Sequence, residues 1–582
     1  MRALKPYLGF LALSALVAPP VAAQWSASGV PVCPAPWRTG ATVMVGDGHG
    51  GAFVAWLDAR DTSATRSIYA QHVLDYGAPD PAWPALGTPA CTLPGSRLQI
   101  HIASDGLGGF FLAWDDKRFG NSLVFLQRVI SGGTLAPGWP ANGVQVSTHP
   151  LAGDVTVFDV VPDGIGGAYL AWRSNDQHHY AQHIDAGGAV VSGWPAAGMQ
   201  LTIGSGTATV MVEPAPSGGC YVLTANLNSA VVTKLTSAGD VDVGWPLEGR
   251  SVLDELGSGI QINGPSYLTT GSNGDLYLAV FGYPSEGQQT LVQRASPEAV
   301  PAWGANGAKA GLSYPYMEQL LLLPEGAGGA FMSYQEGIWG DTYATSWNVR
   351  INRLDATGGP APGWSGAIYA SDTSAAEYGP AGLVSDGADG VYLSWLTVRT
   401  DWPHPRLFVQ HLDGAGQRFP GWPATGIHVC DSDSGQNVSG NPYEYFPTLA
   451  SDGRGGVLVA WDDYRYYPSP IFSAFITRLL GNGQPAVGVG PDPARTVAAL
   501  AVHPNPSSGD LRLALELPRE GRTWLDVLDA TGRRVALRGL GDLPAGRRDI
   551  EWRMPAALPA GLYWVRARWP GGTVARRIAL VH

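Results

Sequence analysis

Charged residues, cysteines and long apolar runs are all scarce in this sequence. Only 14% of the 582 residues are charged, against about 25% in an average globular protein. There are four cysteines, and no Cys/His spacing typical of a metal site. After residue 23, no apolar run approaches the roughly 18 residues of a membrane-spanning helix. We therefore expect no disulfide scaffold, no zinc site and no transmembrane segment in the mature chain.

Helical patterns and catalytic motifs are also missing. No amphipathic stretch of ten or more residues follows the first segment of the chain, which indicates an all-β protein. Gly-x-Ser-x-Gly, His-Glu-x-x-His and phosphate-binding loops do not occur. The sequence therefore favours a binding role over an enzymatic one.

What the sequence does contain is a unit of about 57 residues that occurs eight times. Its first mark is a Trp followed four residues later by Gly; the copy at Trp364 is shortened, with Gly366 in the Gly role. The full copies are Trp25/Gly29, Trp83/Gly87, Trp139/Gly143, Trp194/Gly198, Trp245/Gly249, Trp303/Gly307 and Trp422/Gly426. The second mark is Asp-Gly-x-Gly-Gly followed by an apolar strand ending in Trp, as in Asp105 to Trp114.

This period, with several short strands per unit, predicts an eight-bladed β-propeller over residues 24–485. We expect Val30-Pro-Val32 to form the outer strand of the last blade and so to close the ring, leaving few exposed strand edges. Cys33, Cys91 and Cys430 occupy one slot in three repeats. Equivalent slots in neighbouring blades lie too far apart for a disulfide, so we interpret all four cysteines as small apolar core residues.

The fourth strand of each unit carries a basic residue at one position. These residues are His72, Arg128, His183, Lys234, Arg294, Arg353, His411 and Arg478. Equivalent slots around a ring cannot converge on one metal ion, and histidine alternates with arginine and lysine. The pattern predicts a repeated salt bridge at the surface or between blades.

The two ends of the chain carry separate signals. Residues 1–23 resemble a secretory signal peptide, with Arg2 and Lys5, the apolar run 8–17 and a small-residue cleavage site before Gln24. Residues 486–496 read as a linker. From Val497 to His582, alternating strands and turn signals predict a small immunoglobulin-like β-sandwich.

Four features of this tail stand out. They are Pro504-Asn505-Pro506, Asp529-Ala-Thr-Gly532-Arg533, Ala560-Gly561-Leu562-Tyr563, and the terminal strand with Arg576 and Arg577. In these features the tail resembles the C-terminal sorting domain of cargo of the type IX secretion system, and it is similar to the immunoglobulin-like domain of flagellar hook-capping proteins. The family usually has Lys near the end, where this chain has arginines. The resemblance implies the secretion machinery as a partner, and a secreted or outer-surface bacterial protein.

Charge is distributed unevenly along the chain. The tail from Val497 has 13 Arg and 8 acidic residues, whereas residues 24–496 have 21 basic and 40 acidic residues. Because the repeat region is this acidic, it would repel phosphate groups, and nucleic acid is therefore excluded as its partner. We expect a monomer.

Three Trp-x-Asp-x-Arg sequences begin loops on the face opposite the Asp-Gly-x-Gly-Gly turns. A closed ring would make these three repeats neighbours. The pairs are Asp58/Arg60, Asp116/Arg118 and Asp463/Arg465. They are candidate ligand contacts, and the alternative is a local pair that braces each loop.

Aromatic residues in the later loops are further candidates, because they offer flat surfaces to sugar rings or peptide side chains. These candidates are Trp347, Trp402, Tyr443, Tyr445, Tyr464 and Tyr466. Asp431 and Asp433 begin a short sequence similar to a calcium loop, but the distant bidentate Glu is missing, so an ordinary turn is the simpler interpretation and no cofactor is required.

Together these features predict a secreted or cell-surface propeller that binds an extracellular glycan or protein. A polysaccharide hydrolase or lyase and a purely structural surface component remain the alternatives.

Overall fold

The computed structural model of the protein describes residues 25–26, 28–33, 39–62, 65–97, 99–147, 155–174, 178–201, 210–226, 229–253, 261–262, 266–283, 289–311, 317–339, 344–371, 376–398, 405–430, 436–437, 449–463, 465, 473–486, 499–503, 507, 509–517, 521–529, 534–544, 546–555, 558–569 and 572–581. These residues form strands and turns and no helix, so the all-β prediction is confirmed. They accordingly include no apolar helix of membrane-spanning length. The chain forms two compact units, Met1–Gly488 and Val489–His582.

In the described part of the first unit, the strands form eight antiparallel sheets, numbered here in chain order. Sheets 1 to 4 are β2 (Thr39–Gly46), β3 (Ala52–Thr62), β4 (Thr65–Val73), β5 (Thr88–Cys91); β6 (Ile100–Ser104), β7 (Phe110–Asp116), β8 (Leu123–Val129), β9 (Val144–Gln145); β10 (Val155–Pro162), β11 (Ala168–Ser174), β12 (His179–Ile184), β13 (Met199–Leu201); and β14 (Val210–Pro214), β15 (Cys220–Asn226), β16 (Ser229–Leu235), β17 (Arg250–Ser251).

Sheets 5 to 8 continue the series. They are β18 (Gln261–Ile262), β19 (Tyr267–Thr270), β20 (Leu276–Tyr283), β21 (Gln289–Ala295), β22 (Ala308–Lys309); β23 (Met317–Pro324), β24 (Ala330–Trp339), β25 (Ala344–Leu354), β26 (Ile368–Tyr369); β27 (Ala376–Ser385), β28 (Val391–Val398), β29 (Arg406–Leu412), β30 (Ile427–His428); and β31 (Gln436–Asn437), β32 (Leu449–Ser451), β33 (Val457–Asp463), β34 (Ser473–Leu479) with β1 (Val30–Pro31).

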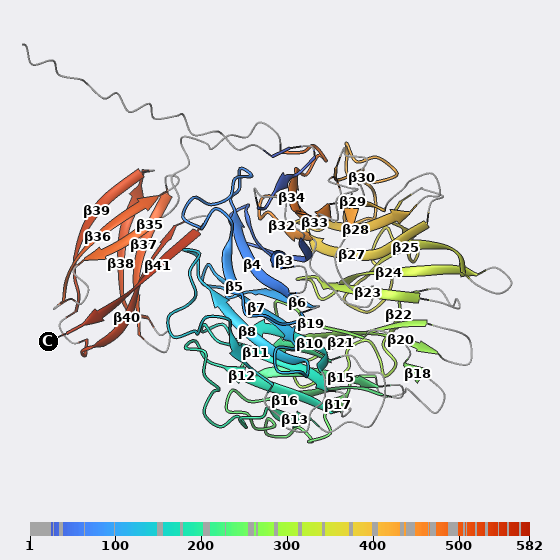
Figure 1. Ribbon diagram of the computed structural model, residues 1–582, viewed down its shortest axis with the longest axis horizontal. Coiled ribbons are helices and arrows are strands. Elements are labelled where there is room, and N and C mark those ends of the chain that lie inside the picture. The colour runs from blue at the N-terminus through green and yellow to red at the C-terminus, as the bar shows by residue number, and fades with distance from the viewer. Residues whose placement is uncertain are drawn as a thin grey trace, which may run out of the picture. The chain divides into compact units, whose positions relative to one another are not determined.

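The sheets follow one another in a closed cycle. Their inner strands contact in the order β2, β6, β10, β14, β19, β23, β27 and β32, and β32 contacts β2 again. Figure 1 shows the result: the orange strands of sheet 8 lie near the blue strands of sheet 1, and β33 and β34 contact β2. β1 pairs with β34 through Val30↔Ile476 and Pro31↔Phe475, which confirms the predicted outer strand of the last repeat.

Each Asp-Gly-x-Gly-Gly sequence forms the turn between the first two strands of a sheet. In sheet 2, Asp105 Oδ1 accepts the backbone N–H groups of Leu107 and Gly109, both at 2.8 Å. A Cβ on Gly109 would lie 2.3 Å from the Val129 carbonyl oxygen, so only glycine fits there. The other oxygen, Asp105 Oδ2, accepts Arg128 Nη2 at 2.8 Å. A single carboxylate therefore shapes the turn and also binds the third strand.

This second contact explains the repeated basic residue and corrects the expectation of a surface or inter-sheet salt bridge. The ion pairs are formed within one sheet and are largely buried: His72–Asp47, Arg128–Asp105, His183–Asp163, Lys234–Asp242, Arg294–Asp275, Arg353–Glu325, His411–Asp386 and Arg478–Asp452. Several of these side chains reach the next sheet through backbone carbonyls instead, as Arg478 Nη1 does with Asp75 O at 3.2 Å.

The Trp of the first mark also joins adjacent sheets. Its indole N–H donates to a backbone carbonyl in the turn after the third strand of the following sheet. The donor and acceptor residues are Trp25–Asp75, Trp83–Ser131, Trp139–Ala186, Trp194–Ser237, Trp303–Ala356, Trp364–Gly414 and Trp422–Gly481. These bonds and the apolar clusters between successive sheets hold the cycle together.

The Gly of the same mark lies against the Trp that ends the second strand of its sheet. Gly143 has φ +79°, and a Cβ there would lie 2.4 Å from Trp114 Cη2. Gly143→Ala is therefore expected to lower the free energy of unfolding by about 2–4 kcal/mol, through overpacking and left-handed backbone strain. Gly120→Ala is the matched control, because Gly120 has φ +98° with nothing within 4 Å of a Cβ. Calorimetric melting of both variants tests this, and equal losses would show that the Trp114 contact is unimportant.

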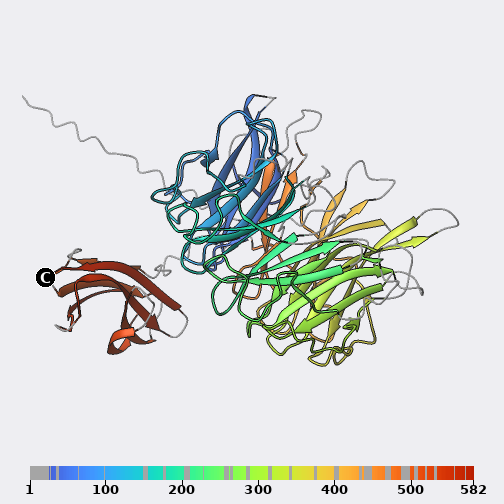
Figure 2. The same ribbon diagram turned by 90° about the horizontal axis from the view of Figure 1, so that it is seen from below.

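The second unit contains two antiparallel sheets. One is β35 (Ala499–His503), β36 (Asp510–Leu517) and β39 (Gly546–Arg553); the other has the order β38 (Arg534–Leu543), β37 (Gly521–Leu528), β40 (Gly561–Trp569) and β41 (Gly572–Leu580). Alternating residues of both sheets, such as Leu513, Leu525, Val565 and Ile578, share one buried core. Figure 2 shows the strands of this unit in red.

Candidate functional site

The three Asp–Arg pairs are formed, and each is built into its own sheet. The Asp is the second residue after the Trp that ends the strand, so its carboxylate returns to that indole N–H. In sheet 8, Asp463 Oδ2 accepts Trp461 Nε1 and Arg465 Nη2, both at 2.8 Å, and Oδ1 accepts the Arg465 backbone N–H at 2.8 Å. The Arg465 guanidinium lies 3.7 Å above the Phe475 ring.

Sheets 1 and 2 repeat this arrangement. Arg60 Nη2 lies 2.6 Å from Asp58 Oδ2, and Arg118 Nη2 lies 2.5 Å from Asp116 Oδ2. The three carboxylates are fully buried, and the arginine side chains are between 8% and 20% exposed. Sheets 8, 1 and 2 are consecutive in the cycle, as expected. Because the carboxylate oxygens are already hydrogen-bonded, a ligand would reach only an edge of each guanidinium.

Three of the four cysteines contact these arginines, which corrects their interpretation as purely apolar core residues; Cys220 lies in an apolar cluster, as expected. Cys91 ends β5, the outer strand of the preceding sheet, and Cys33 and Cys430 each lie two residues beyond the outer strand of the preceding sheet. The Nη2–Sγ distances are 4.0 Å for Arg60–Cys33, 3.1 Å for Arg118–Cys91 and 3.3 Å for Arg465–Cys430. All four cysteines are buried and free of disulfides. The Trp-x-Asp-x-Arg sequence and the cysteine slot are therefore two halves of one contact between sheets.

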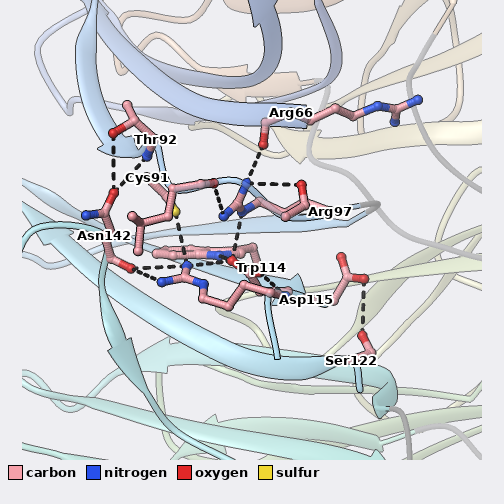
Figure 3. A network of polar contacts seen from close by, with 12 residues as sticks. Arg66, Cys91, Thr92, Arg97, Trp114, Asp115, Ser122 and Asn142 are labelled. Carbon is pink, nitrogen blue, oxygen red and sulfur yellow. Dashed lines mark hydrogen bonds and ion pairs between the residues drawn. The ribbon is translucent and has the colours of Figure 1, made fainter. Parts of the chain in front are cut away.

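In sheet 2, Asp116 binds a second arginine, Arg97, which no sequence motif indicates. Arg97 is completely buried; its Nε donates to Asp116 Oδ2 at 2.8 Å, and its other nitrogens donate to the carbonyls of Arg66 and Leu93. Figure 3 shows this network, with Arg97 next to Trp114. Burial acts to raise the pKa of Asp116, but Arg118, Arg97 and Trp114 hold it below its ordinary value. The carboxylate is therefore a charged structural anchor.

Two partly buried acids on the inner strands were also missed. Asp159 Oδ2 accepts the Val212 backbone N–H of the next sheet at 3.0 Å, and Glu213 Oε2 accepts Thr270 Oγ1 of the sheet after that at 3.0 Å. Burial raises the pKa of Asp159 to about 6, and burial together with the charge of Asp159 raises that of Glu213 to about 8. Since neither residue belongs to a repeated motif, the sequence contained no signal for them.

Most of the predicted aromatic contacts lie outside the described residues. These are Trp402, Tyr443, Tyr445, Tyr464 and Tyr466, and the calcium candidates Asp431 and Asp433 lie outside as well. Within the described ranges, no three His, Cys, Asp or Glu side chains are close enough to hold a metal ion. Ligand binding by the unplaced residues stays a prediction.

Trp347 is the predicted aromatic residue that the structure places. It lies on the long hairpin of β24 and β25, which joins the second and third strands of sheet 6, as the Trp-x-Asp-x-Arg segments do in sheets 1, 2 and 8. It is paired with Gly337 across the hairpin, and its ring packs so closely that a Cβ on Gly337 would lie 3.0 Å from Trp347 Cζ3. The indole is half-buried. The hairpin thus presents a flat ring supported by backbone.

Charged and aromatic side chains support the same hairpin. Arg350 Nε lies 3.6 Å from Glu336 Oε2, and the Arg350 guanidinium lies 4.0 Å above the Tyr369 ring. Tyr369 is 47% exposed, and Tyr378 on the next sheet is 39% exposed. Sheets 6 and 7 therefore carry exposed aromatic residues as well as the half-buried Trp347.

The predicted sorting residues are only partly described. Pro504, Asn505, Pro506 and Gly532 lie outside the described ranges. Gly561 begins β40, and Tyr563 is buried in the core of the unit, donating through its hydroxyl to Pro559 O at 2.9 Å. Arg576 is exposed on β41, which also contains Arg577. These positions have a structural role in the sandwich, and sorting remains a prediction.

No family model matches the chain, and no curated protein matches it. Among solved structures, it is similar to a protein of unknown function from Dyadobacter fermentans, at 12% identity over 66% of this chain and 94% of the other, with a TM-score of 0.33. It is similar to the polysaccharide lyase Uly1 at 10% identity over 66% and 89%, with a TM-score of 0.38. It is also similar to the BP39L lectin from Burkholderia pseudomallei at 12% identity over 67% and 99%, with a TM-score of 0.38. Similarities this distant do not assign the chain to a family.

Proposed function

We propose that this protein binds an extracellular glycan through the end of the first unit that carries the β24–β25 hairpin. The observation that carries the proposal is the Trp347 ring, held against Gly337 on a long hairpin. An indole fixed in this way offers a sugar ring a broad apolar surface, and few rotamers are lost on binding. Tyr369 on the same sheet and Tyr378 on the next sheet are further exposed aromatic residues.

The proposal includes the architecture and the route of export. The first unit is an eight-bladed β-propeller, supported by the closed cycle of sheets and by β1 joining β34. The second unit is an immunoglobulin-like sorting domain of the type IX kind, supported by the tail motifs and by its two-sheet core. The signal-like first 23 residues support export to the outer surface. An enzymatic function has less support from the described residues than a binding function, because the carboxylate of Asp463 is buried and paired with Arg465.

Trp347→Ala is expected to weaken glycan binding at least tenfold, because the stacking surface is lost. The measurement is retention of the full mature chain on an array of neutral glycans, with new reducing ends scored on the same array. Phe119→Ala is the matched control, since Phe119 is an aromatic residue 68% exposed on sheet 2. An equal loss in both variants, or retention unchanged by Trp347→Ala, would contradict the proposed site. Release of reducing ends would establish the enzymatic alternative.

A further inference from the structure

The outer face of the four-stranded sheet of the second unit carries an excess of positive charge. Leu525, Val527, Val565 and Ala567 point into the core, so the residues alternating with them on β37 and β40 point outward. We call this outer side the arginine face. It is defined by Arg522, Trp524, Asp526, Arg534, Trp564, Arg566 and Arg568.

One carboxylate on this face is shared by three guanidinium groups. Asp526 Oδ2 accepts Arg566 Nη2 at 2.9 Å and Arg568 Nε at 2.5 Å, and Arg534 Nη1 lies 3.7 Å from Oδ1. The Asp526 side chain is completely buried beneath them, whereas the arginine side chains are 33%, 38% and 53% exposed. Burial acts to raise the pKa of Asp526, but Arg568 and Arg566 hold it below its ordinary value. Its single negative charge leaves two of the three positive charges uncompensated.

A tryptophan lies directly beside this cluster. Arg522 and Arg568 both lie against the Trp524 ring, with guanidinium carbons 5.8 Å and 6.0 Å from its centroid. Asp542 is opposite Arg522 in the strand register, so the described side chains of the face include four arginines and two aspartates. Half-buried Trp564 lies next to Leu528 across the strands. The face therefore combines guanidinium forks with indole rings.

The other sheet of the same unit differs in its charge balance. There, Arg553 pairs with Asp510 at 2.7 Å and Arg512 pairs with Glu551 at 3.5 Å, one acid to each arginine. All four of these side chains are at least 67% exposed, so these are ordinary surface pairs. The excess charge is thus a property of the arginine face and not of every surface of the unit.

We propose that the arginine face binds an acidic polysaccharide whose sugar rings carry carboxylate groups. Guanidinium groups bind carboxylates through two parallel hydrogen bonds, and the forks of Arg566 and Arg568 are already oriented by Asp526. The rings of Trp524 and Trp564 provide apolar surface to the sugar rings between successive carboxylates. A polymer places several carboxylates in sequence and so neutralises the charges that Asp526 leaves uncompensated.

The test uses the full mature chain and immobilised polygalacturonate, with neutral dextran and phosphatidylglycerol vesicles as alternative probes. We expect retention on polygalacturonate at about 50 mM NaCl, loss of retention at about 500 mM NaCl because exposed charges are screened, and no retention on dextran. Arg566→Gln with Arg568→Gln is expected to weaken binding at least tenfold. Arg512→Gln with Arg553→Gln removes the same charge from the other sheet and is expected to leave binding unchanged.

Two further variants separate binding from folding and from the propeller. The first is a triple variant that combines Asp526→Asn with Arg566→Gln and Arg568→Gln. It removes the buried carboxylate that would otherwise lose its partners. This variant is expected to fold and still to bind weakly. Trp347→Ala is expected to bind polygalacturonate normally, so failure of the propeller site and failure of this face are distinguishable. Equal losses in the two double variants, equal retention on dextran, or retention on vesicles without retention on polygalacturonate would each overturn the proposal.

Discussion

Asp116→Asn is expected to destabilise the first unit by about 3–5 kcal/mol, because it removes the charge that compensates two buried arginines. Arg97 is completely buried and Arg118 is 8% exposed, so neither guanidinium can recover its hydration without disrupting sheet 2. The substitution also weakens the bond from the Trp114 indole and the turn formed by the Arg118 backbone N–H. Removing one member of a buried charged cluster therefore costs more than the net contribution of the cluster itself.

Asp58→Asn provides the matched comparison, and calorimetric melting of the two variants is the measurement. Asp58 has the same Trp56 and Arg60 contacts as its counterpart in sheet 2, but no buried second arginine is bonded to it in the described ranges. Its loss is expected to be smaller, about 1–3 kcal/mol. If both variants lost the same stability, Arg97 would not be the reason for the effect.

Raising the pH from about 5 to about 9 is expected to lower the melting temperature of the first unit by at least about 5 °C. Burial raises the pKa of Glu213 from 4.5 to about 8 and that of Asp462 from 3.8 to about 7. Each group has a higher pKa in the folded chain than in the unfolded chain, so the folded state binds more protons between those values. The stabilisation that these two protonated carboxyl groups contribute is fully present near pH 4, and it is lost as the pH rises through their folded-state pKa values.

His101 is expected to lower the stability at acidic pH, because burial lowers the pKa of its imidazole to about 4. The unfolded chain then binds more protons below about pH 6.5, so stability also falls on acidification. Maximal stability is therefore expected between about pH 5 and pH 6. Tyr267 and Asp159 are the ionisable groups nearest to Glu213, and Asp463 is adjacent to Asp462.

Asp462→Asn tests the cause. An asparagine mimics the protonated carboxyl and keeps an oxygen that accepts the Thr42 hydroxyl. The variant is expected to melt with the parent protein at pH 5 and above it at pH 9. Asp542→Asn, at an exposed position of the second unit, is the control and is expected to keep the parent's pH dependence. If Asp462→Asn were destabilised equally at both pH values, ionisation of Asp462 would not account for the fall.

The repeats made much of the fold predictable. The turn glycines and the pairing of the first strand with the last repeat both follow from patterns that recur at one spacing, and a recurring pattern carries information about its neighbours in space. The partners of the repeated basic residues were harder to predict from the sequence. Seven of the eight acidic partners lie 19 to 28 residues earlier in the chain, across two antiparallel strands, whereas Asp242 follows Lys234, and only the folded chain shows which pairs meet.

Sequence and structure differ most at the candidate site. The Asp–Arg pairs were visible as Trp-x-Asp-x-Arg, and the sequence favoured a local pair that braces each loop over a ligand contact without excluding the latter. The choice depends on burial, and the burial of Asp463 arises from contacts with Trp461 and with Cys430 of the preceding sheet. Arg97 and Glu213 were missed because neither residue belongs to a repeated motif, so only the folded chain shows what surrounds them.

By itself, the sequence determined the all-β class, the eightfold repetition, the turn chemistry and the division between an acidic repeat region and a basic tail. These depend on residue spacing and composition, which act locally. The tertiary structure alone decided which charges are buried, which sheet supplies each partner, and which face of the second unit keeps an excess of arginine. Such properties arise from residues far apart in the chain, and the free energy of a charge depends on the solvent and the partners that the completed fold leaves to it.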